Sequence, residues 1–422
     1  MKVFTSEQTK KIDAILLHKF FGLPILILII GIMFFATFIL GGYFQDFLNL
    51  LVNYVSEILR NNMPDNFFKD LLVNGIISGI GGIIIFLPNI IILFLFISIL
   101  ETSGYIYRIA TIMDKSMHFM GLHGYSFVPL LMGFGCNAIA MLSTHNIENK
   151  SDKLKTILLL PFMSCTARLP LYILITGTLF NDIIAALVII CIYLFGLLIS
   201  VIFGILFKKT IFKEQSEHSK INMPPYRIPQ AKVVGKKISA EVLEYMKKIA
   251  TVILVASIII WWLNNYPKNE VEVHNIKNNG TEINNNVEVN RNTYLMQLGR
   301  FVEPVLRPLG FDWKMSVSLI TGIAAKEAAV STIGILYSTP GEEIYDSMRK
   351  AVHPDGTKVF TISTGLAYLV FYLIYFPCVT VFIVMKKETK SWKYPIFVAL
   401  YTIITAWGVG FLVKIITSLF VS

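Results

Sequence analysis

MGFGCNAIAMLSTHNIENKSDKLKTILLLPFMSCTARLP, residues 132–170, is the stretch that decides how this chain folds. It places Gly133, Gly135, Cys136 and Cys165 inside or beside apolar sequence long enough to reach into a lipid bilayer. A helix broken at these glycines frees backbone amides and carbonyls, which membranes tolerate only inside protein or along a wet cavity. Thiols and free carbonyls are ligands for soft or borderline cations. We interpret the stretch as the first half of a gate for a metal cation.

The composition predicts a membrane protein. Of the 422 residues, 55% are hydrophobic and only 15% are charged, with a mean hydropathy of +0.65, whereas soluble domains carry about 25% charged residues. Apolar runs near 20 residues recur, as a helix that crosses a bilayer requires. The net charge of +10 does not indicate a nucleic-acid partner, because the basic residues cluster in loops beside the predicted spans, where the positive-inside rule places them.

We therefore expect an all-α polytopic membrane protein that spans the lipid bilayer. Its expected parts are a cytoplasmic lead-in (1–19), a first membrane half (20–207), a basic cytoplasmic loop (208–248) and a second membrane half (249–422) with an asparagine-rich external loop (264–293). About seven spans are expected, at residues 20–40, 71–100, 157–179, 183–207, 249–263, 360–385 and 394–416.

Three other segments are apolar but do not look like spans. Residues 43–70 combine helical periodicity with acidic charge, and we expect an external pair of interfacial helices there. Residues 127–142 and 315–337 are interrupted by glycine or polar residues, and we expect both to be re-entrant gate segments. Loop charge places the first on the cytoplasmic side and the second on the external side, which predicts an inverted repeat like those of many secondary transporters.

Five motifs resemble the membrane domain of FeoB, the family of bacterial ferrous-iron transport protein B: GGIIIFLPNIIILFLFISILETSGYIYR, MGFGCN, PFMSCTARLP, TGIAAKEAAVSTIG and YFPCVT. They occur in the family's order and cover most of residues 75–407. The resemblance implies Fe²⁺ transport across the bacterial cytoplasmic (inner) membrane between two gate segments. It also implies a small cytoplasmic Feo partner and a homo-oligomer.

The chain departs from that family at several places. Ala138-Ile139 replace the usual Val-Pro after Cys-Asn, Glu101-Thr102 replace an acidic pair, and His145-Asn146 replace an Arg-Thr. FeoB proteins begin with a GTPase domain, but no GxxxxGK[ST] phosphate loop occurs here. We expect a transporter rather than an enzyme. Three explanations stay open for the GTPase: it lies on another chain, the gene product is truncated, or this relative works without GTP.

The resemblance implies that Cys136, Cys165 and Cys378 line the path of the ion. Fe²⁺ is a borderline ion that thiolates and carboxylates bind, and a permeation site must also release it. The chain has no CxxC motif, so we expect transit of Fe²⁺ as substrate and no permanently bound cofactor. Cys191, within uniformly apolar sequence, is expected in the core, and Arg168 at the external end or paired with an acid.

Three further residues are candidate metal ligands. Glu101 closes the second span and is expected to be an acidic exit ligand or a partner of Arg108. Asn137 is expected to hydrogen-bond the broken backbone or to bind the metal. Glu327, beside Lys326 at membrane depth, is costly there unless it is paired or hydrated, and we expect either a structural pair or a role facing the cavity.

Other functions stay open from the sequence. Fold alone does not settle the substrate, and the gate fold resembles that of nucleoside transporters, so a different solute such as a nucleoside is one alternative. The presence of cysteine in three motifs favours a metal. A membrane scaffold that binds a partner through residues 208–248 is a second alternative. An intramembrane enzyme is disfavoured because no HExxH motif, Gly-Ser-Gly nucleophile or pair of catalytic carboxylates is found.

Overall fold

The computed structural model describes residues 4–18, 21–64, 66–211, 223–247, 251–267, 293–338, 342–353 and 355–421. Within them the chain is helical apart from turns, short extended segments and isolated bridges such as that between Val352 and Lys358. Six helical segments of this described part are long and apolar enough to cross a membrane: Gly22–Asn62, Phe67–Ser103, Lys150–Leu179, Asp182–Thr210, Ile362–Thr389 and Lys393–Phe420. The prediction of an all-α polytopic membrane protein is confirmed.

The N-terminal helices are α1 (Ser6–Leu16), α2 (Gly22–Asn62), α3 (Phe67–Asp70), the π-helix η1 (Leu71–Ile77) and α4 (Ser78–Ser103). The prediction of an external helix pair over residues 43–70 is wrong, because α2 continues unbroken for 41 residues. At 1.5 Å per residue α2 is about 60 Å long, roughly twice the thickness of the hydrocarbon layer.

Small residues bring the second predicted span close to its neighbours. A methyl group added at Gly81 would lie 2.6 Å from the side chain of Val52 on α2, and one added at Gly79 would lie 2.8 Å from Ser257. Glycine therefore permits α4 to approach α2 on one face and α12 (Thr251–Asn265) on another, as expected for helices that pack in a membrane. Only 15 residues long, α12 occupies the position of the fifth expected span, at residues 249–263.

Next come α5 (Tyr105–Phe119), η2 (Gly124–Ser126), α6 (Phe127–Gly133), α7 (Asn137–Ser143), η3 (Thr144–Asn146), α8 (Lys150–Leu159), η4 (Leu160–Phe162), η5 (Thr166–Arg168), α9 (Leu169–Leu179) and α10 (Asp182–Thr210). The α6–α7 pair is the expected broken gate segment. The expected span over residues 157–179 falls on the segment Lys150–Leu179, which is long and apolar enough to cross a membrane. Within that segment helix geometry is lost between α8 and α9, where Pro161 and then extended backbone interrupt the hydrogen-bond ladder.

The second half has α11 (Ala231–Tyr245), α12, α13 (Tyr294–Leu306), η7 (Arg307–Leu309), α14 (Trp313–Ala324), α15 (Ala328–Tyr337), α16 (Ile344–Lys350), α17 (Ile362–Ile374), α18 (Val379–Thr389) and α19 (Lys393–Val421). The expected span over residues 360–385 falls on the segment Ile362–Thr389, which is also long and apolar enough to cross a membrane, and Pro377 lies in a break between its two helices, α17 and α18. The basic loop over residues 208–248 contains α11, which packs on α4. The expected external loop falls largely on residues 268–292, outside the described residues.

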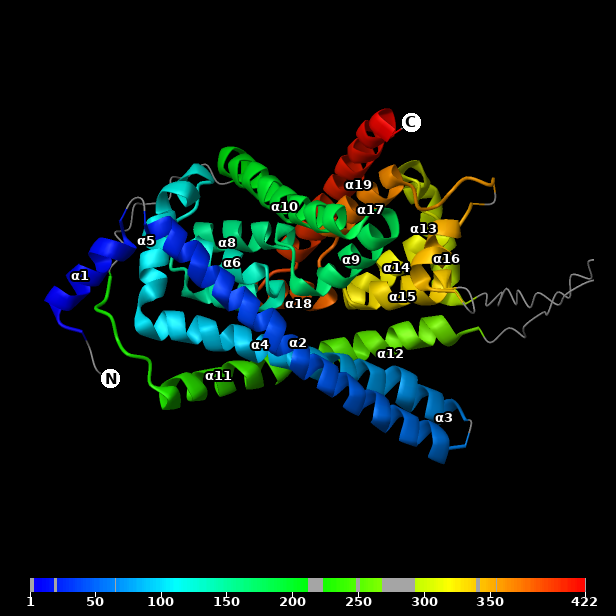
Figure 1. Ribbon diagram of the computed structural model, residues 1–422, viewed down its shortest axis with the longest axis horizontal. Coiled ribbons are helices and arrows are strands. Elements are labelled where there is room, and N and C mark those ends of the chain that lie inside the picture. The colour runs from blue at the N-terminus through cyan, green and yellow to red at the C-terminus, as the bar shows by residue number, and fades with distance from the viewer. Residues whose placement is uncertain are drawn as a thin grey trace, which may run out of the picture.

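The two halves have the same order of elements. Each has a helix, an amphipathic helix, a broken hairpin, a broken span and a long unbroken helix: α4 to α10 in the first half and α12 to α19 in the second. Figure 1 shows the broken helices in the middle of the molecule, with α10 and α19 along one side and α4, α11 and α12 along the other. A single cluster of buried apolar side chains surrounds these broken helices.

Contacts between helix ends separate the two membrane faces. On the basic face, Lys153 of α8 pairs with Glu388 of α18 at 3.0 Å, and α7 ends beside the start of α8. At the opposite end, Arg349 donates to the Thr178 carbonyl that closes α9, at 2.8 Å, and Tyr337 of α15 donates to Asp312, the N-cap of α14, at 2.6 Å. The α6–α7 hairpin therefore opens to the basic face and α14–α15 to the other, in agreement with the predicted inverted repeat.

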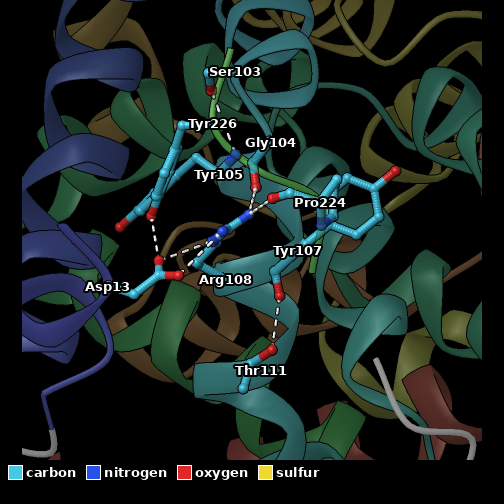
Figure 2. A network of polar contacts seen from close by, with 9 residues as sticks. All are labelled: Asp13, Ser103, Gly104, Tyr105, Tyr107, Arg108, Thr111, Pro224 and Tyr226. Carbon is cyan, nitrogen blue, oxygen red and sulfur yellow. Dashed lines mark hydrogen bonds and ion pairs between the residues drawn. The ribbon is translucent and has the colours of Figure 1, made fainter. Parts of the chain in front are cut away.

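A polar network joins three segments that are far apart in the sequence (Figure 2). The guanidinium of Arg108 on α5 is fully buried and donates to both carboxylate oxygens of Asp13 on α1, at 3.0 and 3.1 Å. It also donates to the Pro224 carbonyl at 2.6 Å and lies 4.1 Å from the centre of the Tyr226 ring. The predicted partnership between Arg108 and Glu101 is wrong, because Asp13 occupies that role.

Candidate metal path at the broken helices

Four breaks interrupt the central helices, where the sequence predicted two. They lie at Phe134–Cys136 between α6 and α7, at Met163–Cys165 between α8 and α9, at residues 325–327 between α14 and α15, and at Tyr375–Cys378 between α17 and α18. Three of the four breaks contain a cysteine. Each break frees main-chain groups that a continuous helix would pair internally, so the neighbours of each break supply the partners.

In the first half, the hairpin is hydrogen-bonded to the broken span beside it. The Asn137 side-chain amide donates to the Met163 carbonyl at 3.1 Å. In the other direction, the backbone N–H and the hydroxyl of Thr166 donate to the Gly135 carbonyl at 3.3 and 3.1 Å. A methyl group on Gly133 would lie 2.8 Å from Cβ of Met163. Glycine at position 133 is thus required for this close approach.

The second half repeats this arrangement with different residues. The Lys326 ammonium donates to the Phe376 carbonyl at 2.8 Å, and the Tyr372 hydroxyl donates to the Lys326 carbonyl at 2.6 Å. The Tyr375 hydroxyl donates to the Leu319 carbonyl at 3.3 Å. A methyl group on Gly322 would lie 2.5 Å from that hydroxyl. Here too a glycine permits the hairpin and the broken span to pack closely.

The three cysteines predicted to line the path are gathered by these breaks. Cys136 interacts electrostatically with Cys378 and Cys165, and Cys378 with Cys165. All three side chains are partly exposed, although many of the residues around them are fully buried. Across the described residues, no three His, Cys, Asp or Glu side chains converge closely enough to hold a metal ion together. The thiols thus surround one region without forming a closed coordination cage.

Cys191 does not belong to this group. It is exposed on α10, so the expectation of a core position is wrong. The physical reason is that lipid-facing and core-facing residues of a membrane helix are equally apolar. An apolar sequence therefore does not show which face of the helix is covered by protein.

The other predicted ligands are placed differently from one another. Asn137 is buried, and its amide oxygen has no hydrogen-bond partner among the described residues. Glu327 is half-buried beside its break and interacts electrostatically with Lys326 and Cys378. Glu101 lies at the end of α4 and pairs with Lys237 of α11 at 2.5 Å. The structure thus brings Asn137 and Glu327 to the breaks but leaves Glu101 paired with Lys237 of α11.

The distance of Glu101 from the breaks can be followed along α4. Leu93 is the α4 residue that meets the first break, since a methyl group on Gly135 would lie 2.6 Å from it. Glu101 follows Leu93 by eight residues, which is about 12 Å along a helix axis. A shared coordination site for Glu101 and the cysteines would therefore require α4 to move.

Arg168 lies beside the break between α8 and α9, where the sequence did not place it. It is neither at the external end nor paired with an acid, because its buried guanidinium donates to the carbonyls of Met163 and Pro161 at 3.3 and 3.5 Å. The break between α8 and α9 frees these carbonyls, and a long cationic side chain reaches them. The sequence does contain a signal for this role as a donor to freed carbonyls. It is an arginine that follows a proline and a serine-cysteine pair within apolar sequence.

Comparison with known families gives two matches. A family model described as "Gate: Nucleoside recognition" matches residues 83–179 and 246–392, and one described as "Ferrous iron transport protein B C terminus" matches residues 189–240. The first match covers the hairpins and the broken spans of both halves. No solved structure matches the chain.

Several curated proteins are similar over nearly the whole chain. The "Fe(2+) transport protein A/Fe(2+) transporter FeoB fusion protein" of Porphyromonas gingivalis is 42% identical, covering 98% of this chain and 52% of the relative. The "Fe(2+) transporter FeoB" of Campylobacter jejuni is 40% identical (96% and 64%), and that of Helicobacter pylori is 34% identical (95% and 65%). The chain therefore spans between half and two thirds of the length of these relatives.

Proposed function

The chain belongs to the FeoB family, in which it corresponds to the membrane region, and we propose on this premise that it conducts Fe²⁺ across the bacterial cytoplasmic membrane. The observation that carries the proposal is the convergence of three breaks that each present a cysteine: Cys136, Cys165 and Cys378. The ion passes between the α6–α7 hairpin, the α14–α15 hairpin and the two broken spans.

The arrangement suits an ion in transit. Thiols, backbone carbonyls and a carboxylate can replace some of the water around Fe²⁺. A conducting site must bind the ion well enough to admit it and weakly enough to release it. An incomplete set of ligands, with Glu327 and the Asn137 oxygen nearby, meets both requirements better than a four-thiolate cage. In this proposal the metal is substrate, and the ligands change as it moves from one break to the next.

The membrane potential is sufficient to drive this movement inward. It favours cation entry by about 2.3 kcal/mol per charge for each 100 mV. A divalent ion therefore gains roughly 4–5 kcal/mol, which supports accumulation on the order of a thousandfold. GTP hydrolysis then gates transport and does not need to drive it. A GTPase domain on another polypeptide and a homo-oligomeric assembly stay predictions.

A small cytoplasmic partner is part of the same proposal. The Porphyromonas gingivalis relative is named as a fusion of Fe(2+) transport protein A with the transporter, which supports an interaction between two such proteins. The cytoplasmic surface available here includes α1, α11 and the segment around Tyr226.

A nucleoside is the second candidate substrate, because the family model that covers most of the chain is described by nucleoside recognition. The test is uptake into proteoliposomes that hold this chain under an inside-negative potential, with anaerobic ⁵⁵Fe²⁺ and with labelled uridine in parallel. We expect saturable Fe²⁺ uptake that the uridine does not compete with. Saturable uridine uptake without Fe²⁺ uptake would replace the proposal by the alternative.

A further inference from the structure

A buried cation stands inside the proposed metal path. The side chain of Lys326 is 3% exposed, and its ammonium donates to the Phe376 carbonyl, two residues before Cys378. It also lies 3.5 Å from the centre of the Tyr375 ring. The Arg168 guanidinium repels it, whereas Cys378, Cys165 and Glu327 attract it. A carbonyl, thiols, a carboxylate and an aromatic face are the surroundings that stabilise a cation with little water.

The internal repeat shows that holding the hairpin does not require a charge. Asn137 follows Cys136, whose backbone angles are φ −152° and ψ 119°, and Lys326 follows Ala325, whose angles are φ −145° and ψ 127°. Asn137 donates to the carbonyl two residues before Cys165, as Lys326 does before Cys378. The two residues thus occupy equivalent positions and make equivalent bonds, but one is neutral and the other is cationic.

From this comparison we propose that Lys326 is an internal competitor of the transported ion and determines how tightly the path holds it. The inference rests on the proposed function. In the empty path the ammonium occupies the neighbourhood of the Phe376 carbonyl and Cys378. A divalent ion that arrives at the same groups is repelled by the ammonium at short range, so one of the two cations must leave.

This competition explains how a path with three thiols releases its ion. Conduction through binding sites depends on repulsion between ions in adjacent positions, because each arriving ion weakens the hold on the one ahead. A tethered ammonium supplies that repulsion without a second metal ion. Lys326 therefore lowers the affinity of the path and raises its rate of turnover.

The test compares charge-removing and charge-keeping variants in the full chain. Initial rates of anaerobic ⁵⁵Fe²⁺ uptake are measured against Fe²⁺ concentration in proteoliposomes at a fixed inside-negative potential. Lys326→Gln keeps an N–H donor, Lys326→Met keeps only the length, and Lys326→Arg keeps the charge. We expect the half-saturating Fe²⁺ concentration to fall roughly tenfold or more in the first two variants, together with a lower maximal rate, and to stay near the native value in Lys326→Arg.

Lys155→Gln is the matched control. Lys155 is 2% exposed and donates to the Gly121 carbonyl at 2.8 Å, but it lies on the basic face of the membrane, and its variant should keep the native half-saturation. Native uptake with an unchanged or raised half-saturation in Lys326→Gln would overturn the role of Lys326 and leave the proposed function standing. Absence of Fe²⁺ uptake in the native chain and in every variant would overturn both.

Discussion

Asn137, Arg168 and Lys326 have the same structural role, because each donates to a carbonyl that a broken helix has freed. All three side chains are almost completely buried. A buried carbonyl that loses its donor costs about 1–3 kcal/mol, because no water replaces the lost bond. These side chains therefore hold the breaks in one geometry, and that geometry positions the cysteines.

The bond from Asn137 can be tested by an isosteric change. Asn137→Leu keeps the side-chain volume and removes the hydrogen bond to the Met163 carbonyl. Arg168 remains as a donor to that carbonyl. We expect the free energy of unfolding in detergent to fall by about 1–2 kcal/mol. Thr402→Val is the control, since the buried Thr402 hydroxyl donates only to carbonyls of its own helix. Equal midpoints of thermal unfolding for both variants would show that the Asn137 hydrogen bond does not stabilise the break.

Residue types predicted part of this site. Cys136 and Asn137 were identifiable because glycines flank them in apolar sequence, and the Cys378 motif because Pro377 precedes it. The placements of Arg168 and Cys191 failed for opposite reasons. A cation in a membrane segment was assumed to need an acid, whereas free carbonyls accept from it equally well. An apolar helix was assumed to be covered by protein, whereas lipid covers it without any change in composition.

At the scale of the elements, α1 and the segment around Tyr226 are joined to the first hairpin through α5. Asp13 on α1 and Tyr226 after α10 both contact Arg108 on α5, and η2 connects α5 to the first hairpin. Burial, and then the hydrogen bond that Tyr226 donates to Asp13 at 2.8 Å, raises the pKa of the Tyr226 phenol above its ordinary value. The phenol therefore stays a donor at every physiological pH.

The junction predicts how firmly α1 is attached. Asp13→Asn leaves the fully buried Arg108 without its counter-charge, and we expect α1 to be held about 2 kcal/mol less tightly. Detached α1 then becomes more than tenfold more populated, and limited trypsin digestion after Lys10 and Lys11 should accelerate in proportion. Glu7→Gln removes only the exposed Glu7–Lys11 pair of the same helix and should digest at the native rate. An Asp13→Asn digestion rate equal to the native one would contradict this account.

Whole elements were predicted unevenly by the sequence. Hydropathy located the long spans and both hairpins, since those depend on length and composition. It overlooked the breaks at Met163–Cys165 and Tyr375–Cys378 because apolar residues continue through them. It also ended α2 too early. Hydropathy does not distinguish a separate helix that lies on the membrane surface from a continuation of the preceding span. Backbone hydrogen bonding decides these features, and tertiary neighbours supply it.

At the scale of the molecule, two halves of opposite orientation meet at the four breaks. Each half contributes a hairpin that opens to its own face and a broken span that continues to the other. An ion between the hairpins is therefore separated from each face by one hairpin. Such an arrangement permits access from one side at a time, as in other transporters with inverted repeats.

The opposite orientation predicts the accessibility of two serines. Ser143 ends α7 and Ser338 follows α15. In a background with all four cysteines replaced by serine, Ser143→Cys should react with an impermeant maleimide only from the cytoplasmic face and Ser338→Cys only from the external face. Labelling of both from the same face would exclude the inverted repeat.

The most direct test of the central claim is Fe²⁺ uptake by the native chain beside a Cys136→Ser, Cys165→Ser, Cys378→Ser triple variant, in proteoliposomes under an inside-negative potential. Cys191→Ser serves as the control, because that thiol is exposed on α10, away from the breaks. We expect the triple variant to lose at least nine tenths of the native initial rate. A tenfold loss corresponds to about 1.4 kcal/mol of stabilisation of the ion along the path. Cys191→Ser should keep the native rate. Native uptake that the triple variant matches would contradict the claim that thiols at the broken helices carry the ion.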